Sequence, residues 1–121
     1  MLRRAKEATE ARRVIQNGVG EILVRTKFRR DEMFDELEMC AEFIISPGQS
    51  VGMHTHDKNM DIFYVLSGEL TAVDHEGREE TVYPGDMILT GGGECHALCN
   101  NSDQEGVILV IVSPNREKAC L

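Results

Sequence analysis

Residues 48–68 read GQSVGMHTHDKNMDIFYVLSG, and this stretch holds most of the features that decide the fold. It begins and ends with glycine, which tight turns at strand ends favour. His54 and His56 lie two positions apart, so on a β-strand both imidazoles project from the same face. Asp61 opens the next apolar run, and an antiparallel return would bring its carboxylate beside the two histidines. The stretch therefore predicts two paired strands that share three metal-type ligands.

A second stretch, residues 85–100, reads GDMILTGGGECHALCN and adds a fourth candidate ligand, His96. Strand alternation places His96 on the face of Leu98 and turns Cys95 and Cys99 to the opposite face. An isolated H-x-H pair is usually a polar surface feature, so the combination carries the argument. Three imidazoles and one carboxylate suit Mn, Fe, Co, Ni, Cu or Zn, and would leave a six-coordinate ion with two open positions. We predict one divalent transition-metal ion bound by four residues, which are His54, His56, Asp61 and His96.

The rest of the chain is typical of an all-β domain of the sandwich or barrel kind. Residues 2–16 are rich in Ala, Glu and Arg and end at Asn17-Gly18, which favours a helical or irregular segment over residues 1–20. We expect the barrel to span residues 21–115 and a short tail to span 116–121. Alternating apolar runs between turn residues predict nine strands, at Glu21–Phe28, Glu38–Ile45, Val51–His56, Asp61–Ser67, Glu69–Asp74, Glu79–Tyr83, Met87–Leu89, Glu94–Asn100 and Val107–Ser113.

The two glycine- and histidine-containing stretches resemble the paired motifs of the cupin superfamily. The first motif has the form G-x5-H-x-H-x3,4-E-x6-G and the second G-x5-P-x-G-x2-H-x3-N. Eight of the ten specified positions are identical here: Gly48, His54, His56, Gly68, Gly85, Gly93, His96 and Asn100. The short segment between the motifs, residues 69–84, is similar to that of small single-domain members. The resemblance implies a cupin-type double-stranded β-helix, or jelly roll, with the metal bound by the matching histidines.

Two positions depart from the family pattern. Gly91 replaces a proline, which loosens a turn. Asp61 stands where the family usually has glutamate, and its side chain reaches about 1.5 Å less far, against metal–oxygen bonds of roughly 2.0–2.2 Å. Three arrangements stay open: direct binding after a small strand shift, binding through water, or a three-histidine site. For Asn100, a turn-forming role is favoured over a hydrogen bond to a metal ligand.

Composition and charge narrow the partners. Twenty-one acidic against thirteen basic residues give a net charge of −8, which disfavours nucleic acid and anionic membranes as partners. The first residues are followed by no apolar segment of the signal-peptide type, so we expect a cytoplasmic protein. The four cysteines form no C-x-x-C pair and are expected to be free thiols, at Cys40, Cys95, Cys99 and Cys120.

Cupins of this kind include dioxygenases, decarboxylases, isomerases and non-enzymatic binding domains, so the resemblance leaves the activity open. The preferred hypothesis is a metal-dependent enzyme acting on a small polar or carboxylate-bearing molecule. The alternative is a non-catalytic, metal-dependent binding or sensing module. The sequence assigns no general acid or base, and an acid or base positioned at the open metal positions would favour the enzyme. Small cupins generally pair through their outer sheets, and outward apolar residues such as Ile62 and Tyr64 favour a homodimer.

Overall fold

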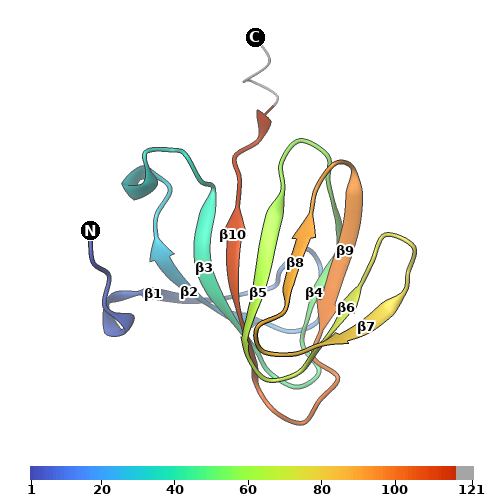
Figure 1. Ribbon diagram of the computed structural model, residues 1–121. Coiled ribbons are helices and arrows are strands. Elements are labelled where there is room, and N and C mark those ends of the chain that lie inside the picture. The colour runs from blue at the N-terminus through green and yellow to red at the C-terminus, as the bar shows by residue number, and fades with distance from the viewer. Residues whose placement is uncertain (117–121) are drawn as a thin grey trace.

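Ten strands and two short 3-10 helices make up the computed structural model, which describes residues 1–116 (Figure 1). Each of the nine strands predicted from the sequence is present, with both ends within a residue of the prediction. The elements are η1 (Ala5–Glu7), β1 (Thr9–Arg13), β2 (Ile22–Phe28), η2 (Asp31–Met33), β3 (Met39–Ile45), β4 (Ser50–His56), β5 (Asp61–Ser67), β6 (Leu70–Val73), β7 (Glu79–Val82), β8 (Met87–Thr90), β9 (Glu94–Cys99) and β10 (Gly106–Val112).

The strands form two antiparallel sheets that face each other. The larger sheet has the order β1-β2-β3-β10-β5-β8, and the smaller has the order β4-β9-β6-β7. Strands distant in sequence are therefore neighbours: β10 lies between β3 and β5, and β9 lies between β4 and β6. This exchange of neighbours between two sheets is the jelly-roll arrangement expected for the chain.

Alternation along the strands fills the space between the sheets with apolar side chains, as predicted. In β3, Ala41 and Phe43 are buried while Glu42 on the opposite face is only half-buried. In β2, Ile22 and Val24 are buried, so Arg25 points outward, where its guanidinium contacts Glu10 at 3.2 Å. The core cluster is Ile22, Val24, Ala41, Phe43, Ile45, Val51, Phe63, Val65, Leu70, Val82, Leu98, Ile108 and Val110.

The sequence favoured a helical or irregular segment over residues 1–20, and the helical alternative is wrong. Residues 5–7 form a single 3-10 turn, and Thr9–Arg13 form β1, which pairs antiparallel with β2 from Thr9↔Thr26 to Arg13↔Ile22. All five side chains of β1 are exposed, so backbone hydrogen bonds to the free edge of β2 hold it. The helix propensity of Ala, Glu and Arg is a weak preference, and an available sheet edge overrides it. Residues 1–20 thus contribute a strand to the larger sheet.

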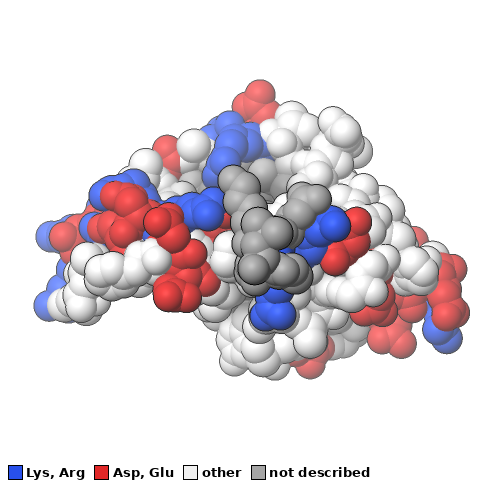
Figure 2. All heavy atoms as spheres, turned by 90° about the horizontal axis from the view of Figure 1, so that it is seen from above, with Lys and Arg blue, Asp and Glu red and all other residues white. Residues whose placement is uncertain are grey.

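The surface carries charged side chains of both signs. Acidic and basic side chains lie side by side at several places on the face seen from above in Figure 2. Among the ion pairs of the surface, Arg30 contacts both Asp35 and Glu38. No helix among residues 1–116 is long and apolar enough to cross a membrane. Three cysteines are free thiols, at Cys40, Cys95 and Cys99. Cys120 and residues 117–121 of the expected tail lie outside the described residues.

Candidate metal centre

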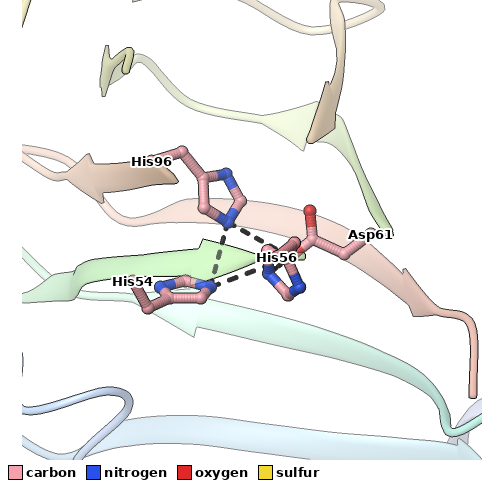
Figure 3. A group of neighbouring side chains, drawn as sticks. All are labelled: His54, His56, Asp61 and His96. Carbon is pink, nitrogen blue, oxygen red and sulfur yellow. Dashed lines mark hydrogen bonds and ion pairs between the residues drawn. The ribbon is translucent and has the colours of Figure 1, made fainter. Parts of the chain in front are cut away.

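The structure brings all four predicted ligands together between the two sheets. His54 and His56 come from β4, and the register of the smaller sheet sets His96 of β9 directly opposite His54. Asp61 is the first residue of β5, which does not pair with β4 as the expected antiparallel return would require but lies in the facing sheet. Its side chain points across the space between the sheets at the three rings (Figure 3). One candidate donor atom from each residue lies within 4.8 Å of the other three. The group is thus able to bind a metal ion, as the sequence pattern predicted.

Four of the distances between donor atoms are close to those around one octahedral ion. Metal–ligand bonds of roughly 2.1 Å put neighbouring donors about 3.0 Å apart and opposite donors about 4.2 Å apart. Here His54 Nε2 lies 3.0 Å from His96 Nε2, and Asp61 Oδ2 lies 2.9 Å from His56 Nε2 and 3.2 Å from His96 Nε2. The distance from Asp61 Oδ2 to His54 Nε2 is longer, at 3.9 Å. The Asp61–His54 distance is therefore close to that between opposite donors of an octahedron, and the other three distances are close to those between adjacent donors.

The shorter aspartate side chain is long enough for direct coordination. Asp61 Oδ2 is as close to two imidazole nitrogens as the donors of a single ion are to one another. Of the three arrangements left open by the sequence, this geometry favours direct binding. Asp61 Oδ1 and His56 Nε2 are also buried without a hydrogen-bond partner. Buried polar atoms without a partner are costly, and a cation among these donors would satisfy them.

Each imidazole is held by its other nitrogen, which leaves Nε2 free for a metal. His54 Nδ1 donates to the Gly52 carbonyl at 2.7 Å, and His56 Nδ1 lies 2.8 Å from Asn59 Oδ1. His96 Nδ1 lies 2.8 Å from Thr90 Oγ1. An acceptor at Nδ1 places the ring proton there and aims the Nε2 lone pair at the centre of the group. Three of the four predicted ligands thus carry the outer hydrogen bond that metal-binding histidines characteristically make.

Burial and opposite charge act against each other on the ionisable groups. Burial lowers the pKa of His54, but the Asp61 carboxylate and the Gly52 carbonyl outweigh it and raise that pKa above its ordinary value. Burial raises the pKa of Asp61, but its contacts with His54 and His96 outweigh it and lower that pKa. Without a metal, the group therefore favours an ionised carboxylate beside a protonated imidazole.

A small cavity of about 80 Å³ opens on His54, His56 and Asp61. Its other walls are mainly apolar side chains of the barrel interior. The lining residues are Ile15, Gln16, Met39, Phe43, Val51, Phe63, Val110 and Val112, besides the three ligands. His96 and Thr90 border a second, larger hollow of about 390 Å³, which Glu94 and Asp86 also line. The open side of the metal site is thus narrow and apolar.

Several other polar and ionisable residues lie away from the metal group. Asp57 is exposed, and Arg25 lies on the outer face of the larger sheet. His75 is exposed in a turn, where its Nδ1 accepts the Cys95 N–H at 3.3 Å. Asn100 is buried, and its amide donates to the carbonyls of Ile45 and Gln104 at 2.8 Å, so it holds a turn as expected.

Sequence reasoning missed the residues that orient the ligands. Asn59 follows His56 by three residues, and Thr90 lies on the inward face of β8, six residues before His96. Thr90 could have been found, because strand alternation turns it inward with Ile88 and buried hydroxyl groups are usually hydrogen-bonded. Gln16 gave no such signal, since it precedes the predicted barrel.

The two-sheet barrel with a three-histidine, one-aspartate cluster defines a metal-site β-barrel of the jelly-roll class. Residues 41–112 match the family model of the cupin domain. The chain is also 30% identical over 115 residues to the oxalate-binding protein of Thermotoga maritima, covering 93% of this chain and 94% of that one. The protein therefore belongs to the cupin family.

Solved structures extend the comparison. A crystal structure from Thermotoga maritima, described as a predicted oxalate decarboxylase, superposes with a TM-score of 0.87 at 28% identity, covering 93% of this chain and 98% of that one. A polyketide cyclase from Streptomyces resistomycificus gives 0.78 at 25% identity, covering 93% of this chain and 80% of that one. An RmlC-like cupin from Shewanella frigidimarina, at 17% identity and a TM-score of 0.71, shares the fold.

Proposed function

We propose that this cupin holds one divalent transition-metal ion at His54, His56, Asp61 and His96. The single observation that carries the proposal is the spacing of the donors, with three contacts of 2.9–3.2 Å and one of 3.9 Å. That spacing fits four sites of an octahedron and leaves two for a ligand. When bound, such an ion acts as a Lewis acid that attracts an anionic oxygen donor.

We further propose that the ligand is a small carboxylate of the oxalate class. The cavity beside the donors is about 80 Å³, far below the roughly 300–1,000 Å³ of sites for drug-sized molecules. The walls are mainly apolar and carry no cationic side chain, so an anionic group would have to find its charge partner in the ion. The relative from Thermotoga maritima, named for binding oxalate, supports this ligand class.

Binding without turnover is the function that the cavity supports best. Among the described residues that line it, the only titratable side chains are the metal ligands themselves. General acid–base catalysis needs a further group within hydrogen-bond reach of the reacting atoms. This cavity therefore favours the binding module, which was the alternative hypothesis from the sequence.

Decarboxylation of the bound carboxylate is the second candidate. It is favoured by Glu94, whose side chain borders the larger hollow together with His96. A carboxyl group on that side could donate or accept a proton in such a reaction. The likeness to the structure described as a predicted oxalate decarboxylase supports the same reaction class.

The test measures metal content, ligand binding and turnover on the same preparations. Protein purified without added metal is analysed for transition metals beside a His54→Ala/His96→Ala variant. Oxalate is then titrated calorimetrically into Mn²⁺-loaded and metal-free protein. About one metal per chain, lost in the variant, with oxalate binding only in the loaded form, is the expected result. If the protein takes up no metal on titration, the proposed metal site is refuted. Steady release of formate and carbon dioxide from oxalate would show that the function is decarboxylation and not binding alone.

We also propose that the chain forms a homodimer through the outer face of the larger sheet. The β5–β8 register sets Leu89 beside Ile62 and Met87 beside Tyr64, which makes a continuous apolar strip on that face. Leu89 is 64% exposed and Met87 is 61% exposed. Exposed apolar patches of this kind favour association. Light scattering of the wild type and a Met87→Glu/Leu89→Glu variant should give a dimer and a monomer respectively, and a wild-type monomer would contradict the proposal.

A further inference from the structure

The turn that joins β1 to β2 forms one wall of the metal-site cavity. This turn runs from Ile15 to Gly18 and is closed by the Gly18 N–H, which donates to the Ile15 carbonyl at 2.9 Å. The same carbonyl accepts the Gly52 N–H of β4 at 3.1 Å. Since β4 also carries His54 and His56, the turn and two metal ligands are fixed to the same strand.

Two glycines make this close approach possible. A Cβ atom on Gly52 would lie 2.1 Å from the Gln16 carbonyl oxygen, and one on Gly18 would lie 2.0 Å from the Ser50 carbonyl oxygen. Both separations are far shorter than any real contact of a Cβ atom, so a side chain at either position would push the turn away. Ser50 adds two hydrogen bonds to Val19, at 2.9 and 3.0 Å. The position of the turn over β4 is therefore a built feature of the fold.

Among the described residues that line the cavity, Gln16 is the only polar one apart from the three proposed metal ligands. Its carboxamide makes no hydrogen bond with any other residue within 1–116. The backbone at Gln16 is left-handed, with a φ of 53°, and Asn17 follows with a φ of 60°. Glycine and asparagine occupy such positions with least strain, and other residues persist there where the side chain has a use. Gln16 is exposed, so it lies at the mouth of the cavity, where its carboxamide is free to exchange water for a ligand that enters.

We propose that Gln16 determines ligand specificity by donating a hydrogen bond from its carboxamide to the carboxylate of the metal-bound molecule. This inference rests on the proposed function, because the metal supplies the main attraction and Gln16 acts on the same ligand. A hydrogen bond from an amide N–H to an ionised oxygen is stronger than one between two neutral groups. In a cavity whose other walls are apolar, that one donor discriminates carboxylates from apolar molecules of the same size.

The test compares variants at the two left-handed positions. Gln16→Gly removes the carboxamide and suits the backbone, while Asn17→Gly makes the same backbone change at a residue that does not line the cavity. We expect Gln16→Gly to raise the Kd of the Mn²⁺-loaded protein for oxalate by about tenfold or more. Its Kd for Mn²⁺ should stay within about twofold of wild type. Asn17→Gly should match wild type in both, and Gln16→Glu should bind oxalate more weakly than Gln16→Gly because like charges repel.

The outcomes separate the role of Gln16 from the metal-dependent carboxylate binding on which it rests. Wild-type oxalate affinity in a Gln16→Gly variant that still binds Mn²⁺ would overturn the role of Gln16 and leave the proposed function standing. Loss of Mn²⁺ in that variant would also overturn it, since Gln16 would then act through the fold of the turn. No metal-dependent oxalate binding by the wild type would overturn both proposals.

Discussion

Replacement of Thr90 by valine tests whether the outer hydrogen bonds prepare the metal site. Thr90 is 4% exposed, and its hydroxyl oxygen lies 2.8 Å from His96 Nδ1. Valine keeps the shape of the side chain, so no cavity forms and the core stays packed. The His96 Nδ1–H, however, loses its acceptor in a buried place, which costs about 1–3 kcal/mol. The ring can then carry its proton on Nε2, where it blocks the lone pair that a metal needs.

We therefore expect Thr90→Val to weaken metal binding by about 10–100-fold. The affinity is measured by competition with a chromophoric chelator, and the free energy of unfolding by urea denaturation of the metal-free protein. Thr90→Ser is the matched control, because it keeps the hydroxyl and loses only a methyl group. Its metal affinity should stay within about threefold of wild type. A folded Thr90→Val protein with wild-type metal affinity would refute the reasoning, because His96 would then be oriented without this bond.

Three further predictions follow from the same geometry. Asp61→Asn should lower metal affinity much more than Asp61→Glu, measured by the same competition, because only the amide removes the anionic donor. In the metal-free protein, protonated His54 should stabilise the fold below its ordinary pKa of 6.5, and this stabilisation should be lost as the pH rises through the raised pKa. Between about pH 6 and about pH 8, the thermal unfolding midpoint of the metal-free protein should therefore fall. The rise in this midpoint on adding metal should grow with pH, because histidines that bind a metal must be neutral. A rise that becomes smaller as the pH increases would contradict this. Gly52→Ala should destabilise the protein by about 2 kcal/mol or more in urea, since its methyl group would meet the Gln16 carbonyl, and an unchanged midpoint would show that the turn shifts freely.

The candidate ligand set was accessible from the sequence because strand alternation is a local property. The two-residue spacing of His54 and His56 puts both rings on one face whatever the partner strand is. Alternation along the strand in the same way places His96 inward with Leu98 and turns Cys95 to the opposite face. The strand bounds followed from turn residues and apolar alternation, which depend on a few neighbouring residues. These local signals also carried the resemblance to the cupin family.

The failures came from features that need contacts between distant segments. The residues of β1 have helical propensity, and only the free edge of β2 makes them a strand. Alternation within β2 does not say which of its two faces turns inward, and the packing of Ile22 and Val24 in the core is what leaves Arg25 outside. The pairing of residues far apart in sequence is decided by loop closure and packing of the whole barrel, which no local pattern records.

By itself, then, the sequence determined the all-β class and the order of nine strands, and it singled out four candidate ligands. Each of these follows from spacing and alternation along one chain segment. Only the tertiary structure decided that Asp61 reaches the imidazoles, that Thr90 holds His96, and that Gln16 borders the cavity. These are distances between atoms on different strands, and a change of an ångström in the packing of two sheets would alter them without changing the sequence pattern at all.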